Sequence, residues 1–197
     1  MQMEGQQLIP APQIKVWEAL NDPEILRQSI PGCETVEKSS DTEFRASLTA
    51  KFGPVKAKFK GHVTLSDLDP PNGYTLTGEG KGGAAGFGKG EAKVSLKEQA
   101  GQTLLSYSVN AKVGGKLAQI GSRLVDAAAK KMADDFFKAF SKNVTSSDQN
   151  TPLQEPPLDM TDAADLNTVI PREPSKNWLL YIGGASLLII LAVYAFN

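Results

Sequence analysis

Few side chains in this chain could carry chemistry. It has one histidine, His62, and one cysteine, Cys33. A zinc site built on several His and Cys ligands is therefore excluded, and a Ser-His-Asp or Cys-His enzyme would have to use His62 as its base. Because no two carboxylates converge by their spacing, we predict no catalytic residue and no metal ligand.

A glycine-rich stretch, residues 78–90, contains a literal match to GxGxxG at residues 78–83. A dinucleotide site would need the last glycine to open a helix whose N-terminus faces the pyrophosphate, but residues typical of strands flank the motif on both sides. Lys89 precedes Gly90 rather than Ser or Thr, so the P-loop pattern also fails. We expect these glycines to clear room at the mouth of a cavity, or to form a merely flexible hairpin.

Lysines at positions 51, 56, 58 and 60 lie on one face of a predicted hairpin, and His62 alternates with them. They could contact anionic lipid or an acidic partner protein, and a solvated sheet face is the alternative. Residues 1–144 hold 19 basic and 16 acidic residues, a net charge of +3. Since the charge is small and no aromatic residues interleave with the lysines, no nucleic-acid binding is expected.

The elements that position these residues follow from the hydrophobic period. Residues 2–9 read as a strand and residues 13–20 as a helix, and Asp22-Pro23 is typical of an N-cap and first helical position, opening a helix at 24–29. The period then changes to two, which predicts half-buried antiparallel strands. They are expected at residues 43–52, 55–65, 74–80, 88–96 and 103–113.

A long helix is predicted at 116–143, with an apolar stripe in steps of three and four. The stripe comprises Leu117, Ile120, Leu124, Ala128, Met132, Phe136 and Phe140. This order of elements predicts an α+β helix-grip fold, in which a curved antiparallel sheet surrounds a long C-terminal helix and usually leaves an apolar cavity.

The end of the chain has a different composition. Residues 145–177 contain five prolines and a net charge of −4, from two basic and six acidic residues, and are predicted to be a disordered linker. Residues 178–196 carry no charge, and as a helix they would be roughly 28 Å long, enough for one transmembrane anchor. Arg172 and Lys176 precede this span, which places the domain on the cytoplasmic side of the membrane.

The body of the chain resembles the CoxG family, the G-type accessory proteins of carbon monoxide dehydrogenase, within the START-like, or Bet v 1-like (SRPBCC), superfamily. The resemblance rests on Val16-Trp17, Asp22-Pro23-Glu24 and Ile30-Pro31-Gly32-Cys33, and it covers residues 1–144. It implies a START-like ligand-binding domain in a non-catalytic accessory protein. Such a protein recruits a molybdenum-containing carbon monoxide dehydrogenase or a related hydroxylase to the cytoplasmic membrane. The resemblance implies no fixed cofactor, but quinone or another apolar small molecule as cargo between bilayer and enzyme.

The residues expected to line the cavity are those on the aligned apolar faces, although plain core packing is the alternative for each of them. They are Trp17, Phe44, Leu48, Phe59, Phe87, Leu117, Ile120 and Leu124. Two other functions stay open: a START-like lipid-binding protein, or a cyclase-type enzyme, unrelated to carbon monoxide oxidation. A cyclase would need convergent acid–base groups inside the cavity, and the predicted inward faces contain almost none.

Overall fold

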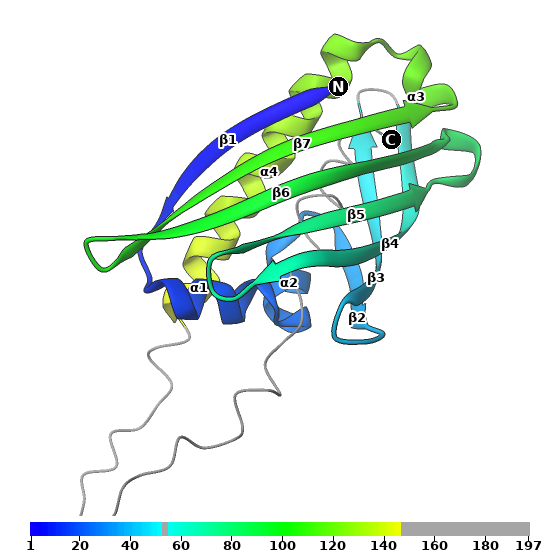
Figure 1. Cartoon of the computed structure of the whole chain (residues 1–197). Helices are drawn as coiled ribbons and strands as arrows, with labels where there is room; N and C mark the ends of the chain where they lie inside the picture. The colour runs from blue at the N-terminus through cyan, green and yellow to red at the C-terminus, as the bar shows by residue number, and fades with distance from the viewer. Residues whose placement is uncertain (53–54, 147–197) are drawn as a thin grey trace, which may run out of the picture.

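The structure is a computed structural model that describes residues 1–52 and 55–146 (Figure 1). The predicted anchor, 178–196, lies outside the described residues, and so does the predicted linker from residue 147 onward. Within the described ranges, no helix is both long enough and apolar enough to span a bilayer. Both the linker and the anchor therefore stay predictions.

Seven antiparallel strands form one curved sheet in the order β1-β7-β6-β5-β4-β3-β2 (Figure 1). Each strand from β2 to β7 pairs with the next along the chain, and β1 closes the far edge against β7. The strands are β1 (Gln2–Ile9), β2 (Cys33–Lys38), β3 (Glu43–Phe52), β4 (Val55–Asp69), β5 (Gly73–Lys81), β6 (Phe87–Gln99) and β7 (Gln102–Gly114).

Helices occupy the two connections that leave the sheet. Between β1 and β2 lie α1 (Gln13–Leu20) and α2 (Pro23–Ser29), and after β7 come α3 (Lys116–Gln119) and α4 (Ser122–Ser146). A short 3-10 turn, η1 (Gly83–Ala85), joins β5 to β6. Figure 1 shows α4 running behind the sheet from the α3 end toward α1 and α2. The α+β helix-grip prediction is thus confirmed for the described part of the chain.

The helix pair α1 and α2 begins where local chemistry requires. Asp22 caps α2, because its carboxylate accepts hydrogen bonds from the backbone N–H groups of Glu24 (2.7 Å) and Ile25 (3.2 Å). The far end of α4 is tied to α2 by the side chain of Asn143, which donates to Ser29 Oγ at 2.9 Å. The last described residues of α4 therefore lie beside α2 and away from α3.

The C-terminal helix differs from the prediction, because one helix over 116–143 is replaced by α3 and α4. Gly121 lies between them with φ of 94°, a value that a continuing α-helix does not allow. The break rotates the first turns of α4, so Val125 and Ala129 face the sheet in place of Leu124 and Ala128. From Met132 onward the predicted stripe is confirmed, since Phe136 and Phe140 are fully buried.

The core fills the space between the sheet and α4. Its largest fully buried side chains include Phe44 and Phe59 from the sheet and Phe136 and Phe140 from α4. The rings of Phe136 and Phe140 lie 5.3 Å apart, and Trp17 meets Tyr74 edge to face at 5.7 Å. This aromatic packing holds the helix against the sheet along most of its length.

Candidate functional site

Glycines replace larger side chains on the face of the sheet that is turned toward α4. Gly61, Gly78, Gly80 and Gly88 are buried and alternate with exposed residues on β4, β5 and β6. Gly80 pairs with both Gly61 and Gly88, and Gly78 pairs with Gly90. Three neighbouring strands therefore project no Cβ into the interior at this point, which makes room for side chains from other elements or for a ligand.

Two glycine-containing loops meet at the same end of the sheet, and we call residues 82–86 and 115–121 the rim loops. Gly86 and Gly115 both have positive φ, 125° and 83°. A Cβ on Gly115 would come within 2.5 Å of the Cα of Gly86, so only glycine allows the two backbones to approach this closely. From below, the ring of Phe59 lies directly against Gly82. The rim is thus packed backbone to backbone.

The GxGxxG match at 78–83 belongs to this rim and not to a nucleotide site. Its first residues are in β5, and the segment after it is η1, a three-residue 3-10 turn that runs directly into β6. No α-helix N-terminus follows the last glycine, so the motif lacks the group that binds a pyrophosphate. The steric interpretation of these glycines is the one that their positions support.

Two of the eight predicted cavity residues lie on the surface of the rim. Phe87 is 49% exposed and Leu124 is 55% exposed. Phe87 begins β6 one position before the inward-facing Gly88, so the alternation of the strand turns its ring outward, where it lies over Gly114. Leu124 is turned away from the interior by the helix break at Gly121. The expectation that these two side chains face the interior is wrong.

The other predicted residues lie inside the fold. Phe44, Leu48, Phe59 and Leu117 are fully buried, Trp17 is 3% exposed, and Ile120 packs against the core from a partly buried position. The three surface grooves described below are lined by none of these six side chains. Their role as the lining of a ligand cavity therefore stays a prediction beside the alternative of core packing.

An apolar groove lies where α3 and α4 meet the edge of the sheet, and we call it the elbow groove. It has a volume of about 490 Å³ and lies beside the second rim loop. Its floor is apolar, with Ala111 and Val125 buried, and Lys112 and Asp126 add charges of opposite sign. The complete lining is Met1, Gln2, Ala111, Lys112, Val113, Ala118, Ser122, Val125 and Asp126. The sequence-based prediction missed this groove, because the bend between α3 and α4 creates it.

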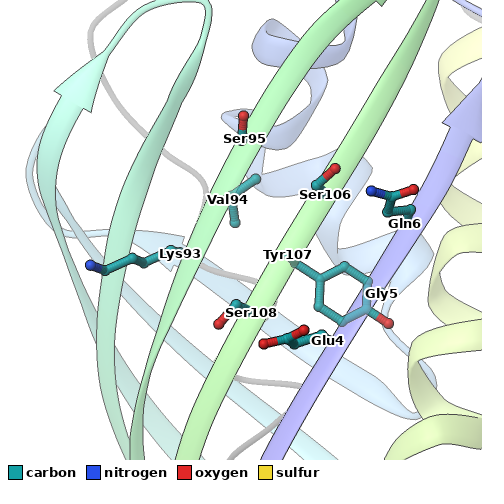
Figure 2. A pocket seen from close by; sticks show the side chains of 9 residues that line it. All are labelled: Glu4, Gly5, Gln6, Lys93, Val94, Ser95, Ser106, Tyr107 and Ser108. Atoms are coloured by element: carbon teal, nitrogen blue, oxygen red, sulfur yellow. The ribbon is translucent and has the colours of Figure 1, made fainter.

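A second groove, of about 570 Å³, crosses β1, β7 and β6 (Figure 2). Its polar residues stand in cross-strand rows, with Ser108 of β7 between Glu4 and Lys93 and with Ser106 between Gln6 and Ser95. A third, of about 360 Å³, is lined by Thr77, Gly78, Lys89, Gly90, Glu91, Asn110 and Lys112. Both are shallow and polar, and neither brings a nucleophile together with a base.

Titratable groups inside the fold are sparse in the described residues. The buried polar side chains there are Ser29, Thr75 and Thr103, and Thr103 donates to the backbone oxygen of Ala11 at 2.7 Å. Burial raises the pKa of the Cys33 thiol to about 11, so Cys33 is poorly suited to nucleophilic attack. No cluster of three His, Cys, Asp or Glu side chains that could hold a metal occurs in the same ranges.

The comparisons with known proteins agree with this architecture. The model of the CoxG family, named for the G-type subunit of carbon monoxide dehydrogenase, matches residues 5–145. Among proteins with curated descriptions, none matches the chain. A crystal structure of a conserved protein from Geobacillus kaustophilus is similar to this chain at 33% identity and a TM-score of 0.70, covering 75% of this chain and 97% of the other.

More distant solved structures share the fold. Ara h 8.0201 has 17% identity and a TM-score of 0.54, covering 74% of this chain and 98% of its own. The Zhui aromatase/cyclase from Streptomyces sp. R1128 has 14% identity and a TM-score of 0.53, covering 76% and 96%. These likenesses show the Bet v 1-like, or START-like, fold and carry no function across.

Proposed function

Because this chain belongs to the CoxG family, we propose that it is an accessory protein of a molybdenum-containing carbon monoxide dehydrogenase or a related hydroxylase. The match over residues 5–145 carries this proposal, since it spans nearly the whole described domain. In this role the protein recruits the enzyme to the cytoplasmic membrane. The uncharged span 178–196 serves as the anchor, and the helix-grip domain stays in the cytoplasm.

The proposal extends to a cargo, quinone or another apolar small molecule, carried between the bilayer and the enzyme. An apolar molecule is stable in lipid and needs an apolar site to reach a soluble enzyme. The elbow groove supports this step, because about 490 Å³ lies within the usual range for small-molecule sites, and Val113, Ala118 and Val125 contribute to an apolar lining. The glycines beneath the rim loops leave the adjacent interior short of side chains, so a ligand there would meet little steric resistance.

Recruitment is tested by cell fractionation. A strain with the full chain is compared with one whose chain lacks residues 177–197, and the partner enzyme is followed in both fractions. The partner is expected in the membrane fraction with the full chain and in the soluble fraction with the truncated one. Membrane-bound enzyme in both strains would refute recruitment through this anchor.

Ligand carriage is tested separately by native mass spectrometry of the detergent-extracted protein. The Ala118→Trp variant places an indole in the elbow groove from an exposed helical position, and Ala127→Trp is the matched control because Ala127 is exposed on α4 outside the lining. A bound apolar molecule is expected in the wild-type protein and in Ala127→Trp, and its loss is expected in Ala118→Trp. A domain that stays empty when extracted from quinone-rich membranes would contradict carriage and leave a simple tether.

A further inference from the structure

The outer face of the sheet is divided by charge. Exposed residues alternate with buried ones along each strand, so the pairing register shows which charges lie side by side on the surface away from α4. The rows nearest the rim loops hold eight basic side chains, which we call the basic strip. They are Arg45, Lys51, Lys56, Lys58, Lys60, Lys81, Lys89 and Lys112.

The strip is only partly neutralised by its acidic neighbours. Glu34 bonds Lys58 at 2.5 Å, Glu79 lies 3.5 Å from Lys81, and Glu37 pairs in register with Arg45. Eight basic and three acidic side chains leave a net charge of +5 at this end. The strand rows farther from the rim carry three acidic and two basic residues, a net charge of −1. They are Glu4, Glu43, Glu91, Lys93 and Lys97.

An aromatic side chain stands within the strip. Phe87 is the cross-strand neighbour of Lys81, and Lys81 in turn pairs with Lys60, so one row across three strands reads lysine, lysine, phenylalanine. Phe87 lies over Gly114, the next position in the row, and half of its surface stays exposed. Leu124 adds a second exposed apolar side chain in the first turn of α4, next to the rim loop 115–121.

We propose that the basic strip and Phe87 form a docking surface for an anionic lipid bilayer. Lysine ammonium groups bind anionic headgroups, and each contributes on the order of 1 kcal/mol near such a surface. An exposed aromatic ring among lysines suits the membrane interface, because the ring enters the headgroup region while the lysine stems extend along it. The combination favours lipid over an acidic protein, which would leave Phe87 to find an apolar pocket of its own.

The length of the remaining chain allows this orientation. The described chain ends at Ser146, beside α2 and at the opposite end of α4 from the rim (Figure 1). With 25 residues, α4 is about 37 Å long. The 31 residues from 147 to 177 have a contour length of roughly 100 Å. A domain anchored through 178–196 can therefore turn its rim toward the same bilayer.

The inference deepens the proposed function, since it makes the rim and the elbow groove the part that touches lipid. It is tested on residues 1–146, without the anchor. This fragment is a reasonable unit, because the Geobacillus kaustophilus crystal structure corresponds over 97% of its chain to three quarters of this one. The measurement is co-sedimentation with phosphatidylcholine vesicles that contain or lack phosphatidylglycerol, at low and high salt.

Two matched sets of variants locate the contact. Lys60→Glu, Lys81→Glu and Lys89→Glu together reverse charge in the strip, and Lys93→Glu, Lys97→Glu and Lys130→Glu make the same change outside it. Phe87→Ser is paired with Leu8→Ser, because Leu8 is 46% exposed at the opposite end of the sheet. Thermal unfolding of every variant verifies that it is folded.

The wild-type domain is expected to bind only the vesicles with phosphatidylglycerol and to be released by salt. The strip variant should lose roughly tenfold or more in affinity, and Phe87→Ser should bind more weakly than Leu8→Ser. Equal losses in the strip and control sets, or no binding to either vesicle, would overturn the inference. The full chain sedimented in parallel separates the two proposals, since an anchored chain with a non-binding domain refutes the docking surface alone.

Discussion

The ring of Phe59, on β4, occupies the position that a side chain on Gly82 would fill. Gly82 has φ of −109°, which any residue can adopt, so the constraint at this position is steric and not conformational. Phe59 is fully buried, and its neighbour across β3 is Leu48. The rim loop 82–86 is therefore held down on the core through one ring-to-backbone contact.

A methyl group at Gly82 should accordingly destabilise the domain. Gly82→Ala is expected to lower the free energy of unfolding by about 2 kcal/mol, because the buried ring must leave its position. Phe59→Leu makes room, so the double variant should lose less than the sum of the two single losses. Urea unfolding of the four proteins measures this coupling, and strictly additive losses would show that the ring does not support the loop.

The two glycines that bound α3 separate backbone strain from steric conflict. Gly121→Ala is expected to cost roughly 1–3 kcal/mol, because φ is 94° there while no atom lies within 4 Å of an added Cβ. Gly115→Ala carries the same conformational strain and also pushes against Gly86. Thermal unfolding should therefore place Gly115→Ala clearly below Gly121→Ala. Similar melting temperatures would mean that the two rim loops separate at little cost.

Local patterns predicted most elements of this fold and failed at two identifiable places. The strand Gln2–Ile9 and the helix Gln13–Leu20 have the predicted bounds, because alternation and paired prolines mark them clearly. The strand Cys33–Lys38 was missed, since it is an edge strand whose two faces are largely exposed and show no apolar alternation. The break at Gly121 was missed, because the apolar stripe continues across it in steps of three and four.

The candidate site was harder to predict for a physical reason. Periodicity tells which side chains face inward, and it placed Phe44, Leu48 and Phe59 correctly. It cannot distinguish a cavity wall from close packing, since both are apolar and buried. Phe87 was misplaced although its strand carried the signal, because the inward glycines that follow it at alternate positions fix its side as outward. The elbow groove depends on a bend that no periodic pattern encodes.

The N-cap of α2 gives a prediction about local stability. Asp22→Ala removes the acceptor for the backbone N–H groups of Glu24 and Ile25, and should lower the free energy of unfolding by about 1 kcal/mol. Asp41→Ala is the control, since Asp41 is largely exposed and its carboxylate lies 3.8 Å from the ammonium of Lys38. Chemical unfolding of both variants measures the difference. Equal stability of the two would contradict the capping role.

The single cysteine gives a prediction about reactivity. Burial raises the pKa of the Cys33 thiol to about 11, so only about one molecule in a thousand carries the reactive thiolate at pH 8. The Sγ also lies 3.4 Å from the backbone oxygen of Thr35. Iodoacetamide should therefore label the folded protein slowly and the urea-unfolded protein rapidly, as measured by mass spectrometry. Rapid labelling of the folded chain would show that Cys33 is neither buried nor protonated as described.

Alkaline pH should destabilise the domain through Tyr74. Burial raises the pKa of its phenol well above the usual value, so the folded state holds this proton more tightly than the unfolded chain does. The stability that Tyr74 contributes is fully present below its unfolded pKa of about 10 and is lost as the pH rises from there toward the folded pKa. Tyr74→Phe keeps the ring against Trp17 and removes the titration.

The melting temperature of Tyr74→Phe should therefore fall less than that of the wild-type protein above about pH 10. Tyr107→Phe is the matched control, because Tyr107 is only partly buried and burial raises its pKa less. Other groups that titrate at alkaline pH, including Cys33, are common to all three proteins, so the comparison isolates the phenols. A Tyr74→Phe profile that follows the wild-type protein would mean that Tyr74 ionises without opening the core.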